Sequence, residues 1–296
     1  MKGIILTNSF YLTQNTIYQS ERLASELTYL GVDMRVLANS NAAFVDGKDI
    51  QSQFADCDFC IFLDKDKYAS AMLEKLGVRV FNSHKAIELC DDKMETYIKL
   101  SGCDIPMPRT VSGLMCYNHD CQPTAEYYDK VEELVGGYPI VVKDCCGSLG
   151  TGVFLASNRA QLEELVRQEV GKPYLVQQAI ATSFGRDVRV IVVGKKVKAA
   201  MLRQSNKDFR SNLGLGGSAN EFVLSQEWRE LCEKVATILD LDYCGIDVLF
   251  GENNKPVICE VNSNAFFGGI EKASGENIAH AYARLILDEM QNKGKK

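Results

Sequence analysis

The stretch GIDVLFGENNKPVICEVN, residues 245–262, carries the clearest structural pattern of the chain. Apolar residues alternate with others along its first half and recur in its second half, which is typical of half-buried β-strands. Glycine, asparagine and proline residues between the two halves are the residue types that turns favour. We therefore predict a β-hairpin whose turn is centred on Asn253 and Asn254.

This register places two acidic residues opposite one another. A turn centred on Asn253 and Asn254 pairs Asp247 with Glu260, and a register shifted by one residue would separate them. Asn262 shares the face of Glu260, because side chains alternate along a strand. Two facing carboxylates repel each other unless a cation lies between them, and Mg²⁺ prefers carboxylate and amide oxygens. The pattern therefore predicts either a magnesium site or an ordinary hairpin whose acidic side chains point to water.

Length and charge restrict the class of protein. A chain of 296 residues can hold two or three subdomains with a sizeable core. The formal net charge of −6 and the pI near 5.3 argue against nucleic acid as an obligatory partner, because phosphate binding favours a basic surface. No run of 18 apolar residues is present, and the N-terminus turns polar too soon for a signal peptide. We therefore predict a cytoplasmic protein that does not bind membranes.

Eleven cysteines are present, and several lie within apolar strand or helix patterns. In a cytoplasmic protein this distribution favours reduced, buried thiols. Cys57 and Cys60 form a C-x-x-C motif, but the motif falls within a predicted strand and lacks the helix N-terminus that lowers the thiol pKa in redox motifs. Cys116, His119 and Cys121 lie close together, but their spacing matches no common zinc site and favours a surface loop.

Strands and helices alternate over the first 82 residues, which predicts a parallel, doubly wound layer. Strands are predicted at 3–8, 32–38, 58–63 and 78–82, with helices at 15–30 and around 71–76. The turn after the first strand contains no glycine, so a dinucleotide-binding fingerprint is absent. Residues 83–101 are predicted as one helix that begins at Ser83 and ends before Gly102.

A lysine and three glycines mark the middle of the chain. PIVVKD (139–144) is predicted as a strand with Lys143 in an otherwise apolar run, which is costly for an ammonium without a partner. The following loop, CCGSLGTG, leads into a second strand rather than a helix, which excludes a Walker loop and a Rossmann turn. Gly147, Gly150 and Gly152 therefore favour a mobile flap whose backbone amides approach phosphate, although a plain turn has the same pattern.

The remaining segments precede and follow the predicted hairpin in the sequence. Strands are predicted at 174–180 and on both sides of the turn Gly194–Lys195, and a helix at 225–240 precedes the hairpin. The polar, glycine-bearing segment 206–220 carries Arg210 and suits either a loop that crosses an anionic site or an ordinary solvated loop. A glycine-rich loop and a final amphipathic helix follow the hairpin.

Together these motifs resemble those of the ATP-grasp superfamily, and specifically of a RimK-like carboxylate–amine (α-L-glutamate) ligase. The similarity runs from about Asp91 to Leu287 and is most specific in DDKMETYIKLSG, VVKDCCGSLGTGV, GRDVRVIVVG, DFRSNLGLGG and CEVNSNAFFGG. It implies an α/β, ATP-grasp fold with an N-terminal Rossmann-like (pre-ATP-grasp) layer. The implied parts are an N-terminal domain at 1–92, a central subdomain with the flap at 93–178 and a C-terminal subdomain with the metal site at 179–296.

The resemblance also implies roles for individual residues. The implied cofactor-binding residues are Lys93, Lys143, Gly147, Gly150, Gly152, Gln178, Ala179, Asp187, Arg210, Ser211 and Asn212. The implied metal ligands are Asp247, Glu260 and Asn262. The implied catalytic residues are Arg203, Arg210 and Asn212. The lysines would bind phosphates, and the hinge at Gln178 and Ala179 would bind adenine. The family usually has glutamate and an aromatic residue at this hinge, but a neutral amide can still hydrogen bond to the adenine edge.

The implied reaction has two steps. A substrate carboxylate attacks the γ-phosphate of ATP to give an acyl phosphate and ADP, and an amine then displaces phosphate to form an amide. The implied cofactors are ATP and Mg²⁺, or Mn²⁺ in its place, and the implied substrates are an amino acid such as glutamate and a carboxylate acceptor. Metal and cationic side chains would neutralise the transferred phosphoryl group. The resemblance is also compatible with a homo-oligomer.

Two other functions could use the same nucleotide site. An ATP-binding regulatory module without turnover would be expected to lack a lysine or a metal ligand, whereas this sequence has the complete set. A phosphotransferase would leave the phosphate on its substrate instead of releasing it. The fate of the phosphate therefore separates these functions.

Overall fold

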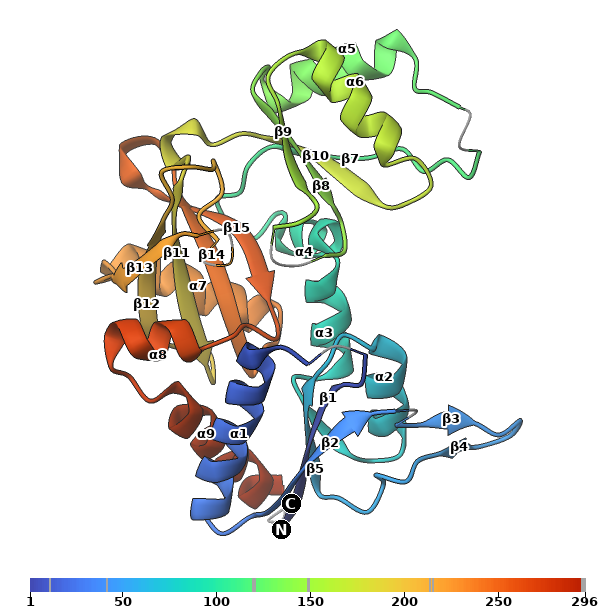
Figure 1. Cartoon of the computed structure of the whole chain (residues 1–296), viewed down its shortest axis with the longest axis vertical. Helices are drawn as coiled ribbons and strands as arrows, with labels where there is room; N and C mark the ends of the chain where they lie inside the picture. Colours follow the sequence, from blue (N-terminus) through green and yellow to red (C-terminus); the bar gives the residue numbers. More distant parts are fainter. Residues whose placement is uncertain are drawn as a thin grey trace.

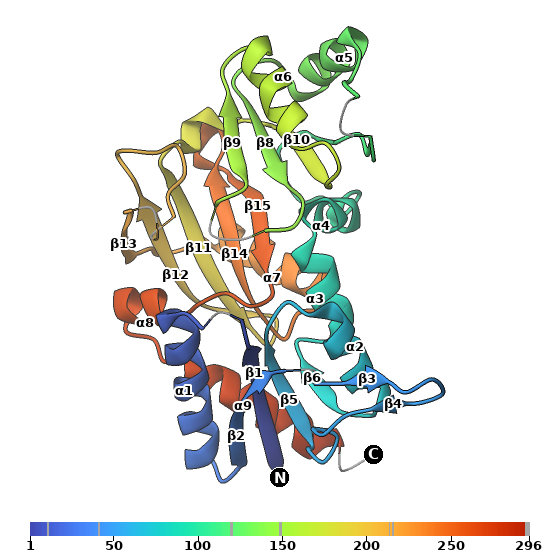
Figure 2. The ribbon, with the colours of Figure 1, turned by 45° about the vertical axis from the view of Figure 1, so that its right-hand side comes forward.

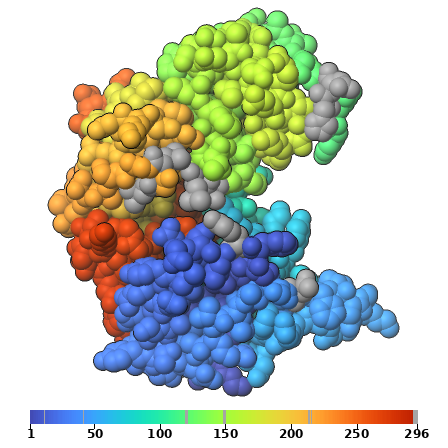
Figure 3. Space-filling view, in the orientation of Figure 1, coloured from blue at the N-terminus to red at the C-terminus, as the bar shows by residue number. Residues whose placement is uncertain are grey.

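The computed structural model describes residues 1–10, 12–40, 42–118, 121–147, 150–212, 214 and 216–293. These residues form an α/β structure with three larger sheets, which follow one another along the longest axis of the molecule (Figure 1). The sheet from the middle of the sequence, residues 110–178, lies at the end of the molecule opposite the N-terminal layer, and the surface is hollowed between these two parts (Figure 3).

The N-terminal sheet is parallel, as the sequence predicts. Its strands lie in the order β2-β1-β5-β6, and apolar side chains fill both of its faces. The elements are β1 (Lys2–Asn8), α1 (Gln14–Tyr29), β2 (Asp33–Asn39), β5 (Phe59–Leu63), α2 (Lys67–Lys75) and β6 (Arg79–Phe81). A short ribbon of β3 (Phe44–Val45) and β4 (Ile50–Gln51) projects from this layer, and no sequence pattern predicted it.

The prediction of one helix over residues 83–101 is wrong. The segment forms α3 (His84–Asp91) and α4 (Lys93–Leu100), which are separated by Asp92 in an extended conformation. The Asp92 carboxylate accepts hydrogen bonds from the backbone N–H groups of Met94, at 2.8 Å, and Glu95, at 3.2 Å. Aspartate favours such a cap over a helix interior, so a new helix begins after it. The break places Lys93 in the first turn of α4.

The middle sheet is antiparallel, with strand order β7-β10-β8-β9. Its elements are β7 (Thr110–Ser112), α5 (Ala125–Val135), β8 (Ile140–Asp144), β9 (Val153–Ala156), α6 (Arg159–Gln168) and β10 (Tyr174–Gln178). Both helices pack on the face that carries Ile140, Val142 and Val176. Because side chains alternate, Val141, Lys143 and Gln177 point to the opposite face. The glycine-rich loop joins β8 to β9, as predicted.

The C-terminal sheet is antiparallel, with strand order β13-β12-β11-β14-β15. Its elements are η1 (Ala181–Ser183), β11 (Arg186–Val193), β12 (Lys196–Gln204), β13 (Ser218–Glu221), α7 (Gln226–Ile238), β14 (Tyr243–Phe250), η3 (Glu252–Asn254) and β15 (Pro256–Asn262). Helix α7 packs through Trp228 and Val235 on the face that carries Val188 and Val190. The alternate residues of β11, Asp187 and Arg189, therefore point away from α7.

The predicted hairpin forms, but by a different register from the one expected. Near the turn, Val248 pairs with Ile258 and Phe250 with Pro256, so the register there is shifted by one residue and the turn is centred on Asn253 instead of between Asn253 and Asn254. A β-bulge then restores the register, so that Asp247 pairs with Glu260 as predicted. The acidic pair is confirmed, and the predicted register next to the turn is wrong by one residue. Cys259 is the extra residue that makes up the difference.

The C-terminus returns to the N-terminal layer. Helix α8 (Gly268–Ser274), which lies where a glycine-rich loop was predicted, precedes α9 (Ile278–Lys293). Tyr282 and Ile286 of α9 share a buried cluster with Leu23 and Leu27 of α1, and the two helices lie side by side (Figure 2). The division at residues 92 and 178 stays a prediction. Every helix within the described part of the chain is too short or too polar to cross a bilayer.

Candidate active site

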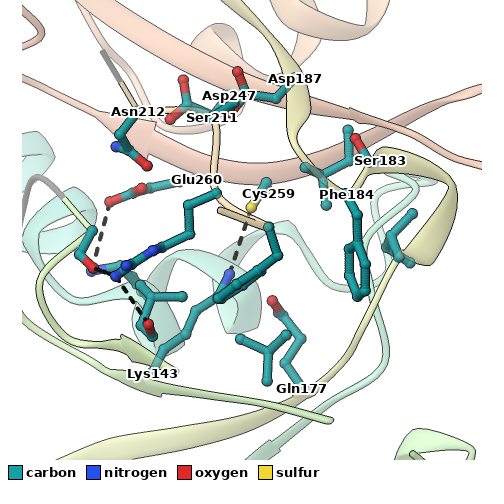
Figure 4. Close-up of a pocket in the computed structure, with 18 of the residues that line it drawn as sticks. Lys143, Gln177, Ser183, Phe184, Asp187, Ser211, Asn212, Asp247, Cys259 and Glu260 are labelled. Atoms are coloured by element: carbon teal, nitrogen blue, oxygen red, sulfur yellow. Dashed lines mark hydrogen bonds and ion pairs between the residues drawn. The ribbon is translucent and has the colours of Figure 1, made fainter. Parts of the chain in front are cut away.

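A pocket lies between the inner faces of the middle and C-terminal sheets (Figure 4). All predicted site residues line it except Ala179 and Asn262: Lys93, Lys143, Gly147, Gly150, Gly152, Gln178, Asp187, Arg203, Arg210, Ser211, Asn212, Asp247 and Glu260. The tip of the predicted flap, residues 148–149, and residues 213 and 215 of the polar loop lie outside the described residues.

Buried carboxylate and guanidinium groups cross the floor of this pocket. Strand register pairs Asp187 with Arg203, and Arg189 with Asp247. Arg203 donates to both oxygens of Asp187, from Nε to Oδ1 at 2.7 Å and from Nη2 to Oδ2 at 2.5 Å. Its Nη2 also lies 2.9 Å from Asp247 Oδ2. Arg189 holds both oxygens of Asp247, with Nη2 at 2.8 Å from Oδ2. Asp187, Asp247 and Arg203 were predicted site residues, whereas Arg189 was not among them.

This pairing fixes the charge of Asp247. Burial alone would raise the pKa of this carboxyl, but the guanidinium groups of Arg189 and Arg203 outweigh burial and lower its pKa to about 2. Asp247 is therefore ionised throughout the physiological range.

Two lysines face the carboxylates from the other side of the pocket. Lys93 Nζ lies 3.2 Å from the carbonyl oxygen of Gly147 and 3.6 Å from Glu260 Oε1. Lys143 Nζ is buried and lies 3.5 Å from Cys259 Sγ (Figure 4). Burial raises the pKa of the Cys259 thiol, so this neighbour is a neutral thiol rather than a counter-ion. The two ammonium groups are positioned to meet an anion in the pocket.

The polar loop lies against the glycine-rich hairpin. Arg210 Nη1 donates to the carbonyl oxygens of Gly150 and of Val153, the latter at 3.3 Å. The same guanidinium donates to both carboxylate oxygens of Asp208, from Nε to Oδ1 at 2.9 Å and from Nη2 to Oδ2 at 2.8 Å. A Cβ atom on Gly150, whose φ is +76°, would approach Asn212 Oδ1 to 3.1 Å. Glycine therefore permits both the backbone conformation and the close contact between loop and hairpin.

The wall of the pocket near the hinge is apolar. Val141, Ile180, Phe184, Phe209 and Leu249 line it, together with Ser183 and Arg186, and none of these was a predicted site residue. Alternation could have revealed two of them, because Val141 shares a strand face with Lys143, and Leu249 shares one with Asp247. Ile180, Phe184 and Phe209 lie outside helices and strands, and Ser183 and Arg186 lie at the ends of η1 and β11, so no periodic pattern marks them.

The hinge itself is held by its neighbours. Gln178 donates its backbone N–H to the carbonyl oxygen of Arg109 at 2.8 Å, and its side-chain oxygen accepts from the Arg109 N–H at 3.3 Å. Gln177 is buried and donates to Thr110 Oγ1 at 2.8 Å. The Gln178 side chain is thus engaged with Arg109, the residue before β7, while Gln178 still lines the pocket.

The donor set at the hairpin has the chemistry of a magnesium site. Asp247 and Glu260 face each other on β14 and β15, and Asn262 lies two residues beyond Glu260. These groups offer hard oxygens, and Mg²⁺ takes its remaining ligands from water and phosphate. Within the described residues, no group of three or more His, Cys, Asp or Glu side chains could hold a metal ion. The metal assignment therefore rests on two carboxylates and an amide.

The cysteines form no second site within the described residues. All eleven thiols are free. Burial raises the pKa of the Cys57 thiol to about 11, which is the opposite of what a thiol redox centre requires. His119, the third member of the cluster with Cys116 and Cys121, lies outside the described residues.

Curated relatives are similar over most of this chain. β-Citrylglutamate synthase B of Danio rerio is 37% identical over 78% of this chain and 56% of its own length, and N-acetylaspartylglutamate synthase A of Homo sapiens is 35% identical over 78% and 58%. The chain thus spans little more than half the length of these two relatives. A probable α-L-glutamate ligase of Marinomonas sp. (strain MWYL1) is 32% identical over the full length of both chains.

Solved structures share the fold. A RimK domain ATP-grasp protein from Sphaerobacter thermophilus matches with a TM-score of 0.70 at 19% identity, covering 97% of this chain and 100% of that one. The ATP-grasp ligase PsnB, in complex with a phosphomimetic variant of a minimal precursor, Mg and ADP, matches with a TM-score of 0.67 at 16% identity, covering 97% of this chain and 98% of that one. The predicted ATP-grasp fold is confirmed.

The RimK-like ATP-grasp domain model matches residues 90–286. This span contains the glycine-rich hairpin, the polar loop and the acidic pair that together line the pocket. The chain belongs to the RimK-like ATP-grasp family.

Proposed function

We propose that this chain is an ATP-dependent carboxylate–amine ligase that forms an amide bond through an acyl-phosphate intermediate. The observation that carries the proposal is one pocket in which lysine and arginine side chains face the Asp247–Glu260 pair. Cations on one side and hard oxygen donors on the other suit the polyphosphate of ATP. Family membership supports the same reaction, since the relatives described above are named ligases and synthases.

The nucleotide would lie along the pocket from its apolar wall to its cations. Val141, Ile180 and Leu249 offer an apolar surface for adenine, and backbone groups of the hinge at Gln178 and Ala179 could pair with its edge. We assign Asp187 to the ribose side of the nucleotide. The phosphates would then reach Lys93, Lys143 and the amides of Gly147, Gly150 and Gly152.

The acidic pair would hold the metal. Asp247, Glu260 and Asn262 are the proposed ligands for Mg²⁺ or Mn²⁺, and the ion would supply charge neutralisation for the transferred phosphoryl group. Arg203, Arg210, Ser211 and Asn212 surround the place where the acyl phosphate would form. The guanidinium forks of the two arginines suit carboxyl and phosphoryl oxygens, so they would stabilise the charge that develops there.

The names of the relatives suggest the substrates. The relatives are called synthases of β-citrylglutamate and N-acetylaspartylglutamate, and a probable α-L-glutamate ligase. We therefore propose glutamate as the amine donor and a small-molecule or peptide carboxylate as the acceptor. An acidic chain with eleven free thiols further supports a cytoplasmic location. A homo-oligomer is compatible with this scheme.

The test is a screen for ADP release with the full chain, ATP and Mg²⁺ over a panel of carboxylates and amino acids. With a productive acceptor, hydroxylamine in place of the amine is expected to yield a hydroxamate, and the true amine is expected to yield an amide with free phosphate. A phosphorylated product stable to hydroxylamine would instead show a phosphotransferase. ATP binding without ADP release across the panel would show a regulatory module. Glu260→Gln serves as the inactive control.

A further inference from the structure

Arg189 occupies an unusual position in the row of charged groups. Its guanidinium holds both oxygens of Asp247, and its side chain is only 13% exposed. Arg203 also contacts Asp247, but it has a second, bidentate partner in Asp187. Within the described residues, the ion pairs of Arg189 involve Asp247 alone. Arg189 is therefore the guanidinium that would lose its partner if Asp247 bound something else.

The backbone beside Arg189 is built to admit this side chain. Gly245 lies on the same strand face as Asp247, two residues before it. A Cβ atom at Gly245 would lie 3.1 Å from Arg189 Cδ and 2.4 Å from the Cβ of Ala265. Glycine at this position leaves room for the Arg189 stem to run along β14. The contact with Asp247 is thus supported by its surroundings.

This contact conflicts with metal binding at the same carboxylate. A Mg²⁺ ion binds carboxylate oxygen at about 2.1 Å, closer than any hydrogen-bond donor. Its positive charge would then lie next to a guanidinium on the same two oxygens, in a buried environment that screens charge poorly. A metal ion and Arg189 therefore exclude one another at Asp247, unless the guanidinium moves.

We propose that Arg189 is an internal counter-ion that occupies Asp247 until a metal–nucleotide complex displaces it. The inference rests on the proposed function, because it concerns the proposed metal ligand Asp247. Phosphate oxygens that arrive with the metal offer the released guanidinium a new anionic partner, since a guanidinium fork suits phosphoryl oxygens. Metal alone offers no such partner. The chain would therefore bind free divalent cations weakly and bind them tightly together with nucleotide.

The experiment measures equilibrium binding of Mn²⁺ to the full chain by electron paramagnetic resonance, with and without a non-hydrolysable ATP analogue. In the wild-type chain, the analogue is expected to tighten Mn²⁺ binding strongly. In Arg189→Met, which keeps the length of the stem, Mn²⁺ alone is expected to bind about tenfold tighter than in the wild type, and the gain from the analogue shrinks accordingly. Arg189→Lys, which retains one point charge, is expected to lie between the two.

Arg79→Met is the matched control. Arg79 also contacts a buried aspartate, Asp242, at 2.9 Å, but this pair lies outside the pocket, so Mn²⁺ affinity is expected to stay at the wild-type value. Unchanged or weaker Mn²⁺ binding in a folded Arg189→Met chain would overturn the inference. If the methionine variant does not fold, unchanged or weaker binding in Arg189→Lys overturns it in the same way. If the Glu260→Gln chain binds Mn²⁺ with the same affinity as the wild-type chain, the result would instead overturn the metal site of the proposed function.

Discussion

The buried salt bridge between Asp187 and Arg203 on the C-terminal sheet leads to our first prediction. We expect the loss of Arg203 to destabilise the fold more than the loss of the Asp187 charge. Arg203 is 4% exposed and serves both Asp187, which is 8% exposed, and Asp247, which is 4% exposed. Arg203→Met leaves Asp187 buried without its counter-ion, and breaking a buried pair in this way costs about 3–5 kcal/mol. That loss is a large part of the roughly 5–15 kcal/mol that is typical for a folded domain.

The converse change is milder. Asp187→Asn keeps a hydrogen-bond acceptor, and Arg203 retains Asp247, so we expect a loss of about 1–3 kcal/mol. In the double variant no charge at position 187 is left buried without a partner. We therefore expect Asp187→Asn/Arg203→Met to be more stable than Arg203→Met alone, which is a strongly non-additive result.

Urea titration followed by tryptophan fluorescence tests this order, without nucleotide or metal. Trp228 is the single tryptophan and packs through α7 on the opposite face of the same sheet. Its emission therefore reports unfolding of the sheet that carries the pair. Additive losses in the double variant, or a loss below about 1 kcal/mol in Arg203→Met, would refute the assigned coupling.

Further changes test the site one group at a time. Glu260→Gln is expected to lower turnover about a hundredfold or more at an unchanged melting temperature, because a metal ligand is worth several kcal/mol; near-normal ADP release at ordinary Mg²⁺ would contradict its assignment. Lys143→Ala is expected to weaken ATP binding about tenfold or more in calorimetry, since a charge-assisted contact is lost; equal affinity would place the phosphates elsewhere. Gly150→Val is expected to lower kcat more than ATP affinity, because φ is +76° and the added Cβ atom would approach Asn212 Oδ1 to 3.1 Å; a wild-type kcat would argue against a closing flap. Because its pKa is lowered in the folded state, ionised Asp247 is expected to stabilise the metal-free fold above pH 3.8, and this contribution is lost as the pH falls from 3.8 through its folded pKa of about 2. The difference in the free energy of unfolding between the wild type and Asp247→Asn is therefore expected to shrink below about pH 4, and a constant difference would refute the shift.

Local patterns in the sequence determined most of the elements and the acidic pair. Alternating apolar residues and turn residues act over a few positions, so the strands, the glycine-rich hairpin and the pairing of Asp247 with Glu260 could be predicted. The pairing was predicted from a register that is off by one residue next to the turn, and the bulge at Cys259 compensates for the error. A bulge depends on how both strands pack, so its position has no local signature.

Contacts between distant segments were decided by the tertiary structure alone. Asp92 divides the predicted helix because its carboxylate caps α4, while its backbone forms a bridge with Cys146 of the glycine-rich loop. Arg189 meets Asp247 only because β11 lies next to β14, although 58 residues separate them in the chain. Sequence patterns report which face a side chain takes, but they do not report which strand lies beside it. The residue types of the site could therefore be read from the chain, whereas the partner that each charge finds depends on the packing of the sheets.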